Sequence, residues 1–246
     1  MLVENKFIYV SLPRCASSSF MASCINQNLK IQHLKKDWDI ETQNKKYNVD
    51  ITKVDYTNFE IFPLYHGHEP INELRDKFGN SYDVISVKRD KYDRFISLWG
   101  HFLNWSYVTN DTDTFGKCLN LTMNDIFFYK TNDLQTSDSI KEQVEIFVKT
   151  YKLDNLTKGA KGILHVLLTP YSRWHNHDPN IIWFDFNELY KLEEWVSKKL
   201  DINFKLIKLN SSKHFQPNLL LNDEFKEKYN SIYLPYDEIK NVKTFF

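Results

Sequence analysis

Two segments of the chain each place an arginine and several hydroxyl groups directly after an apolar stretch. Residues 7–12 (FIYVSL) run into PRCASSS, and residues 84–87 (VISV) run into KRD, with Arg94 and Ser97 following at helical spacing. A strand that turns directly into a helix gathers backbone N–H groups, the helix N-terminus and a guanidinium at one point, and such a point binds anions. Two of these points indicate a ligand with two separate phosphate-type groups.

The first of these loops offers Arg14 and the hydroxyls of Ser17, Ser18 and Ser19. It lacks the GxxxxGK(S/T) pattern of nucleoside-triphosphate P-loops, and no aspartate behind an apolar strand is an evident magnesium ligand. An arginine presents a planar fork of N–H donors that suits a phosphate or a sulfonate. Taken alone, this loop fits an anion site and an ordinary serine-capped turn equally well. In the second segment a strand is followed by RD and then by DRFIS, and this order favours the anion site.

Strand and helix patterns alternate along the chain, which predicts an α/β protein with a central parallel sheet flanked by helices. Strands are expected at residues 7–12, 62–66, 82–88, 181–184 and 204–209, and helices at 17–29, 69–78, 92–105, 123–129, 137–151, 187–200 and 223–232. Residues 163–168 fit a strand or a helix end, whereas 30–58, 106–121 and 210–218 are expected to be mainly irregular. Ligands of such sheets bind beyond the carboxyl ends of the strands, where both arginine loops fall. The absence of a repeat or a linker predicts one domain over residues 1–246.

The composition predicts a soluble, cytoplasmic protein. Lys and Arg together number 32, as do Asp and Glu, and this balance argues against a nucleic-acid-binding protein. The cysteines, Cys15, Cys24 and Cys118, form neither a disulfide framework nor a CxxC pair. The sequence has no signal peptide and no apolar run of about 20 residues, so no membrane span is expected. Its oligomeric state cannot be read from the sequence.

In combination, the two segments resemble the cofactor motifs of sulfotransferases that use 3′-phosphoadenosine 5′-phosphosulfate (PAPS). In that family PKTGSTS binds the 5′-phosphosulfate, and RDPxxRxxS binds the 3′-phosphate. The loop PRCASSSF is similar to the PKTASTSF of the uronyl 2-O-sulfotransferases, and YHGH at residues 65–68 matches the segment that carries the catalytic histidines of that branch. The SRW at residues 172–174 and the segments after it follow the order of the Golgi carbohydrate sulfotransferases.

The resemblance implies a P-loop-like sulfotransferase fold, PAPS as cofactor and 3′-phosphoadenosine 5′-phosphate (PAP) as product. It implies that His68 is the general base, with His66 beside it, and that Arg14 takes the place of the lysine that neutralises the leaving phosphate. The cofactor-binding residues that it implies are Arg14, Cys15, Ala16, Ser17, Ser18 and Ser19 for the 5′-phosphosulfate, Arg89 and Ser97 for the 3′-phosphate, and Ser211, Ser212 and Lys213 in a loop over the nucleotide.

The chemistry of sulfuryl transfer suits these roles. It resembles phosphoryl transfer, an in-line displacement in which the protein positions the reactants and stabilises negative charge on the leaving oxygen. The leaving group is already a phosphate, so no metal is required. The acceptor hydroxyl, expected on a carbohydrate, needs a base near neutral pH, and the ordinary histidine pKa of about 6.5 suits that task. Glu69 is a further candidate base, ranked below His68.

The chain departs from the family motifs at two positions. Arg14 keeps the charge of the family lysine but cannot give up its proton, so only electrostatic stabilisation is expected from it. Lys91 replaces the proline after Arg-Asp, which is a milder change because that proline mainly shapes the first helical turn.

Two alternative functions remain open from the sequence. The pairs His66/His68 and His175/His177 are compatible with a metal-dependent hydrolase, because alternate histidines on a strand point the same way and can chelate. The chain is also compatible with a PAP-binding protein that has no catalytic activity.

Overall fold

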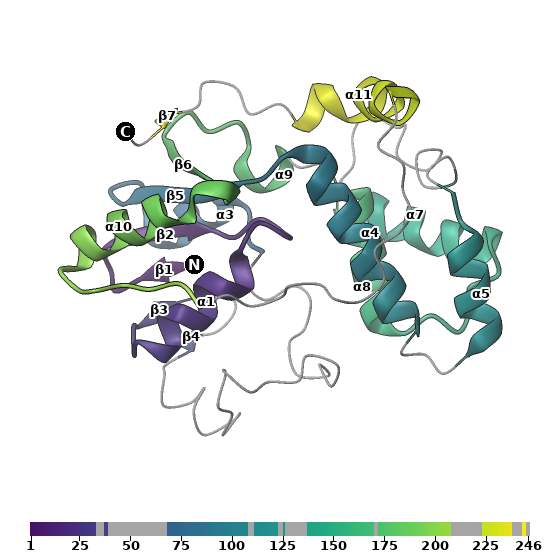
Figure 1. Cartoon of the computed structure of the whole chain (residues 1–246), viewed down its shortest axis with the longest axis horizontal. Helices are drawn as coiled ribbons and strands as arrows, with labels where there is room; N and C mark the ends of the chain where they lie inside the picture. The colour runs from purple at the N-terminus through teal and green to yellow at the C-terminus, as the bar shows by residue number, and fades with distance from the viewer. Residues whose placement is uncertain are drawn as a thin grey trace. The chain divides into compact units, whose positions relative to one another are not determined.

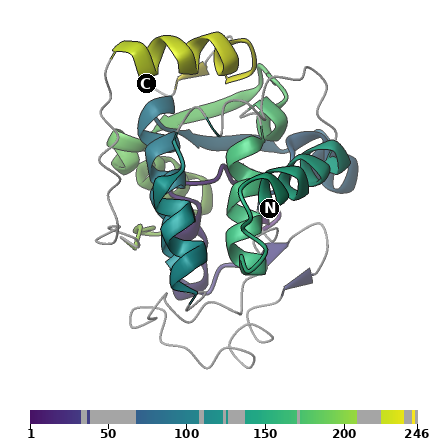
Figure 2. The same ribbon diagram turned by 90° about the vertical axis from the view of Figure 1, so that its right-hand side faces the viewer.

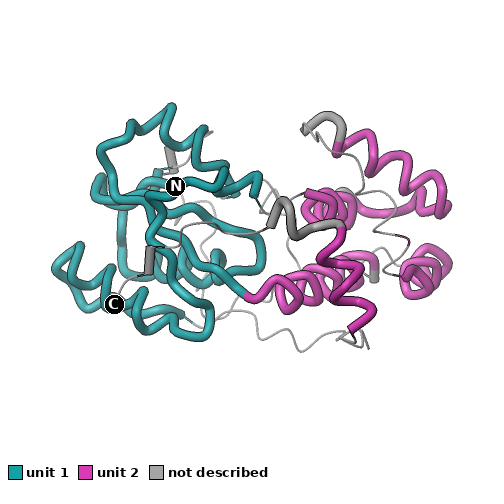
Figure 3. Tube along the Cα trace, turned by 90° about the horizontal axis from the view of Figure 1, so that it is seen from above, with its two compact units in different colours: residues 1–89, 172–211, 239–246 teal, residues 90–171, 212–238 magenta. Residues whose placement is uncertain are grey.

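The computed structural model describes residues 1–32, 37–38, 68–107, 111–122, 125, 137–169, 172–207, 223–237 and 243–244. The chain forms two compact units (Figure 3). Unit 1 comprises residues 1–89, 172–211 and 239–246, and unit 2 comprises residues 90–171 and 212–238. Each unit is assembled from segments that are distant in the sequence. The assignment of one domain to residues 1–246 stays a prediction.

Unit 1 contains a mixed sheet with the strand order β4-β3-β1-β2-β5-β6-β7 (Figure 1). The strands are β1 (Leu2–Val3), β2 (Phe7–Val10), β3 (Ile31–Gln32), β4 (Asp37–Trp38), β5 (Asp83–Lys88), β6 (Ile181–Asp185) and β7 (Lys243–Thr244). β2, β5, β6 and β7 run parallel, whereas β1 pairs antiparallel with β2 and β3, and β3 with β4. The α/β class is therefore confirmed, but the prediction of a parallel sheet is wrong for the β1 side. Only the short turn at residues 4–6 joins β1 to β2, and a connection of this length permits only antiparallel pairing.

Two helices cover one face of this sheet. The helical segments of unit 1 are α1 (Ser17–Asn26), α3 (Ile71–Phe78), α9 (Ser172–His175), the 3₁₀ helix η3 (Phe186–Glu188) and α10 (Leu189–Leu200). The Phe7 ring lies 6.5 Å from Phe20 of α1 and 5.1 Å from Trp195 of α10, so both helices pack on the side of the sheet that Phe7 faces (Figure 1). Tyr9 faces the same way, because side chains alternate along a strand, and it stacks on Phe20 at 4.0 Å. These fully buried rings fix α1 against β2.

Unit 2 is helical in the part that the structure describes. Its helices are α4 (Lys91–Tyr107), α5 (Thr112–Asn120), α7 (Ser137–Thr150), α8 (Lys158–Leu168) and α11 (Asp223–Asp237). α4 and α8 run side by side (Figures 1 and 2). α11 packs on the start of α4, where the Phe95 ring lies 5.8 Å from Phe225 and 5.7 Å from Tyr229. The Asp90 carboxylate caps α4 by accepting the backbone N–H groups of Tyr92 and Asp93.

Most of the predicted elements form, with ends that differ by a few residues, but two predictions are wrong. Residues 106–121 were expected to be irregular and include the end of α4 and all of α5, which begins because the Asp111 carboxylate accepts the N–H groups of Asp113 and Thr114. Residues 204–207 form no strand, because their backbone bonds to side chains: the N–H of Phe204 donates to Ser197 Oγ (3.0 Å) and that of Leu206 donates to Glu193 Oε1 (2.7 Å). Residues 163–168 are the last part of α8.

Several predicted segments fall outside the described residues: the strand at 62–66, nearly all of the helix at 123–129 and the loop at 210–218. None of the helices that the structure describes combines the length and the apolar character needed to cross a membrane.

Two helical glycines of unit 2 give opposite predictions for substitution by alanine. A Cβ at Gly159 of α8 would overlap the Trp105 ring of α4, whereas a Cβ at Gly116 of α5 would meet no atom within 4 Å. Gly159→Ala should lower the free energy of unfolding by about 1–3 kcal/mol because of this overlap. Gly116→Ala should raise it by about 0.5–1 kcal/mol, because alanine loses less backbone entropy in a helix. Urea unfolding of both variants checks the pair, and a stabilising Gly159→Ala would contradict the close packing of α4 on α8.

Candidate anion-binding site

The two arginine loops emerge at the same edge of the sheet. β2 and β5 are parallel neighbours with Val10 beside Ser86, so the residues that follow the two strands leave the sheet together. Arg14 follows β2 and Arg89 follows β5 directly, and Arg89 Nη1 donates to the backbone oxygen of Arg14 at 3.4 Å. The residues that the sequence predicts for two phosphate sites therefore meet in unit 1 through Arg14 and Arg89.

The turn between β2 and α1 has an unusual backbone conformation. Arg14 and Ala16 both have positive φ (64° and 60°), and Cys15 between them is fully buried. The left-handed backbone conformation is energetically costly for residues other than glycine. A turn in which right-handed and left-handed residues alternate can point successive N–H groups into a concave anion-binding site. The N-cap of α1 is Ala16, which has no capping side chain. Of the two interpretations that the sequence left open for this loop, the ordinary serine-capped turn is therefore wrong.

The hydroxyl groups of the loop differ in exposure. Ser17 is buried, with 8% of its surface exposed, Ser19 is half-buried, and Ser18 is exposed. All three belong to the first turn of α1, where backbone N–H groups point out of the helix and are not used by helical hydrogen bonds. This end of α1 can receive an anion through its N–H groups, with Arg14 beside it.

Positive charge accumulates at this edge of the sheet. The pKa of Arg14 is lowered to about 10, first by burial and then by the nearby charge of Arg89, while Cys15 acts in the opposite direction. Arg14 is still a cation at neutral pH. Arg89 Nε is buried without a hydrogen-bond partner, and no carboxylate among the described residues forms an ion pair with Arg89. Two neighbouring guanidiniums of this kind are stabilised by a bound anion.

His68 is tied to the same end of β2. Its Nδ1 lies 2.8 Å from the backbone oxygen of Ser11 and 3.2 Å from Ser11 Oγ. A carbonyl oxygen can only accept a hydrogen bond, so Nδ1 carries the hydrogen, and the lone pair of the neutral ring is on Nε2. Ser11 is buried and lies between β2 and the Arg14 turn. The ring is thereby fixed in the tautomer that a base acting through Nε2 requires.

Glu69, the second candidate base, is also buried. Its Oε2 lies 3.6 Å from the amino group of Met1. β1 and β2 are antiparallel, and the Met1 amino group donates to the Tyr9 backbone oxygen at 2.9 Å, so the Glu69 carboxylate lies at the same edge of the sheet as His68.

Other predicted site residues are not brought to this edge by the described structure. Ser97 belongs to α4 in unit 2, so its contribution to a 3′-phosphate site stays a prediction. His66 and the loop residues Ser211, Ser212 and Lys213 lie outside the described residues.

The second histidine pair is engaged in local contacts. His175 is fully buried, and its Nδ1 accepts the backbone N–H of His177 at 3.0 Å. The Asp178 carboxylate forms an ion pair with Arg75 at 2.8 Å. In the part of the chain that the structure describes, no group of three or more His, Cys, Asp or Glu side chains is arranged to hold a metal ion. The metal-dependent alternative thus gains no supporting contact here.

The sequence analysis missed two residues of this edge. Ser11 was assigned only to the first strand, although a polar residue at the end of an apolar strand is a signal for a contact at the strand end. Phe186 follows the strand predicted at 181–184 and was given no role, yet its ring centroid lies 4.6 Å from Arg89 Cζ. This contact follows from the pairing of β5 with β6, which the sequence pattern does not contain.

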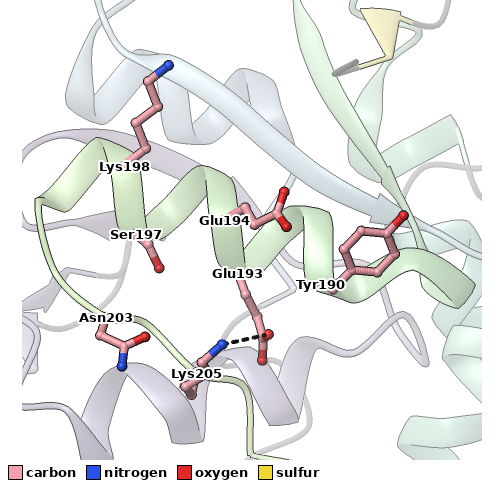
Figure 4. Close-up of a pocket in the computed structure, with 7 residues that line it drawn as sticks. All are labelled: Tyr190, Glu193, Glu194, Ser197, Lys198, Asn203 and Lys205. Carbon is pink, nitrogen blue, oxygen red and sulfur yellow. Dashed lines mark ion pairs between the residues drawn. The ribbon is translucent and has the colours of Figure 1, made fainter.

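A separate groove lies along α10 and contains none of the predicted site residues (Figure 4). It has a volume of about 440 Å³, and its lining consists of Tyr190, Glu193, Glu194, Ser197, Lys198, Asn203 and Lys205. Lys205 and Glu193 in this lining pair with each other at 3.7 Å. The groove therefore shows no excess of one charge that would select an ionic ligand.

Comparisons of the chain with protein-family models, with curated proteins and with solved structures find no match. The likeness to PAPS-dependent sulfotransferases thus rests on the short motifs of the sequence, and the case for a function rests on the chemistry of the residues at the ends of β2 and β5.

Proposed function

We propose that the chain is a PAPS-dependent sulfotransferase that moves a sulfuryl group to a hydroxyl of a carbohydrate. The observation that carries the proposal is the convergence of Arg14, Arg89, the N-terminus of α1 and His68 at one edge of the sheet. A donor with two phosphate-type groups needs two cationic contacts, and a hydroxyl acceptor needs a base. The described residues offer both within unit 1.

The left-handed turn and α1 would hold the 5′-phosphosulfate. Backbone N–H groups at the helix N-terminus and the hydroxyls of Ser17 and Ser18 are suitable donors for its oxygens. Arg14 would stabilise the charge that develops on the leaving phosphate oxygen, and it would do so as a fixed cation, since its pKa of about 10 keeps it charged at neutral pH. The fit of this group is supported by the positive φ angles of Arg14 and Ala16 and by the N-terminus of α1, whose N-cap residue makes no side-chain hydrogen bond.

Arg89 would bind the 3′-phosphate. Its Nε–H is buried and has no partner within the described residues, and a phosphate oxygen would supply the missing acceptor. A guanidinium can bind two phosphate oxygens at once, which a lysine in the same place cannot do.

His68 would take the proton of the acceptor hydroxyl. The bond from Nδ1–H to the Ser11 carbonyl leaves Nε2 as the basic nitrogen, and the proton would move from the hydroxyl to Nε2 as the oxygen attacks sulfur. The bond between sulfur and the bridging oxygen would then break, and PAP would leave with both electrons of that bond.

The first test compares the binding of PAP and ADP by calorimetry, with EDTA present. Arg89→Ala should weaken PAP binding about ten- to a hundredfold, because a charge-assisted hydrogen bond to phosphate is lost, and should leave ADP binding nearly unchanged. Lys6→Ala is the matched control, because it removes one exposed positive charge before the opposite end of β2. If Arg89→Ala binds PAP as tightly as the wild type, Arg89 does not bind the 3′-phosphate.

His68→Asn separates catalysis from binding. The new amide N–H can still donate to the Ser11 carbonyl, but no basic nitrogen remains at the position of Nε2. PAP release from PAPS, measured with a uronic-acid-containing oligosaccharide acceptor found by screening, should fall about 10²- to 10⁴-fold, while PAP affinity stays unchanged.

The matched control for His68→Asn is His177→Asn, which removes a histidine of the metal-dependent alternative. It should keep wild-type turnover. Wild-type turnover in His68→Asn would exclude His68 as the base, and PAP binding without transfer to any acceptor by the wild type would favour a non-catalytic protein.

Arg14→Met should stabilise the protein while it removes activity. The substitution keeps an apolar side chain of similar length and removes the repulsion between Arg14 and Arg89, so the free energy of unfolding should rise by about 0.5–2 kcal/mol. Arg75→Met is the contrasting control, because it breaks the ion pair with Asp178 and should lower the free energy of unfolding by about 1 kcal/mol. Urea unfolding without ligand measures both, and a clear loss of stability in Arg14→Met would contradict the charge repulsion.

A further inference from the structure

The register of the sheet places an aromatic ring beside Arg89. β5 and β6 are parallel neighbours, and Lys88 pairs with Asp185 as the last residue of each strand. Arg89 and Phe186 are the next residues along the two chains, so they leave the same edge side by side. The Asp185 carboxylate accepts the backbone N–H of Asn187 at 2.8 Å and caps η3, which fixes the position of Phe186 at the start of that helix.

Phe186 is not a core residue like its neighbours. Trp183 and Phe184 are 3% and 2% exposed, whereas Phe186 is only half-buried. Its ring lies against the guanidinium, with Arg89 Cζ 4.6 Å from the ring centroid. The aromatic face attracts the cation and holds it against the ring, so this contact can orient the half-buried Arg89, which forms no ion pair with a carboxylate among the described residues.

The two contacts of Arg89 restrict its guanidinium from different directions. Arg89 Cζ lies over the ring of Phe186, and Nη1 donates to the Arg14 backbone oxygen at 3.4 Å. The buried Nε–H has no partner in the described residues. Since Phe186 holds the guanidinium and Nη1 is already hydrogen-bonded, the edge formed by Nε and Nη2 can bind two oxygens of an anion.

We propose that Phe186 is a positioning residue that orients Arg89 for the 3′-phosphate of the nucleotide, and that it thereby contributes to the preference for PAP over ADP. This inference rests on the proposed function. Phe186 does not need to touch the nucleotide: a long arginine side chain has many rotamers, and the ring selects those in which the N–H edge is presented to the ligand.

Calorimetric titration of Phe186→Leu with PAP and with ADP tests the inference. Leucine keeps an apolar side chain but has no aromatic face, so PAP affinity should fall roughly tenfold, while ADP affinity stays within experimental error. Phe186→Trp should keep the wild-type ratio of PAP to ADP affinity, because its ring can also stack on a guanidinium. Tyr190→Leu, an aromatic-to-leucine change at an exposed position of α10, is the matched control and should keep the wild-type ratio.

Thermal unfolding of each variant, measured without ligand, separates positioning from stability. A Phe186→Leu protein that unfolds earlier but keeps the wild-type affinity ratio would overturn the inference, because the ring would then be only structural. Equal loss of PAP and ADP affinity would overturn it as well. If the wild type itself binds PAP and ADP equally, the proposed function fails together with this inference. Both are supported if Phe186→Leu loses the preference for PAP over ADP and Phe186→Trp keeps it.

Discussion

The candidate site depends on the register of three neighbouring parallel strands. β2, β5 and β6 are hydrogen-bonded so that their carboxyl ends share one edge, and each strand delivers one group there: β2 the Arg14 turn, β5 Arg89, and β6 Phe186. A slip of one residue would turn every side chain of a strand to the opposite face. Arg89 would then lose both its contact with the Phe186 ring and its hydrogen bond to the Arg14 backbone oxygen. The hydrogen bonds between the strands are therefore as much a part of the site as the side chains.

The arrangement at this edge is unfavourable for the protein without a ligand. Two guanidiniums lie close together, non-glycine residues adopt left-handed conformations, and the buried Nε–H of Arg89 has no acceptor among the described residues. The surrounding core stabilises the arrangement, since the stacked rings of Tyr9 and Phe20 hold α1 against β2. An energetically costly cluster that the surrounding core stabilises is typical of a binding site. At such sites the residues that suit a ligand are often not those that would make the folded protein most stable.

The sequence was sufficient to predict the two arginine loops, but not the residues from other parts of the chain that contact them. Apolar strands that run into arginine and serine predicted β2, α1 and β5, and placed both arginine loops beyond the carboxyl ends of the strands, but they did not predict the contact of Arg89 with Arg14. The contact of His68 with Ser11 bridges 57 positions of the chain, and the contact of Arg89 with Phe186 depends on pairing between distant strands. Contacts of this kind are set by topology and register, which local patterns do not contain. The antiparallel β1 was missed because two-residue strands leave no periodic pattern to detect.

In the proposed reaction, the bond between His68 and the Ser11 carbonyl would have a consequence for repeated turnover. A backbone oxygen has no titratable proton, so it can accept Nδ1–H both when the ring is neutral and when it is the imidazolium. The imidazole can therefore gain a proton on one nitrogen and lose it to water without a flip of the ring or a change of hydrogen-bond partner on the other. Each catalytic cycle would begin with the ring already in its reactive orientation, and recovery of the base would require only a proton transfer rather than a conformational step.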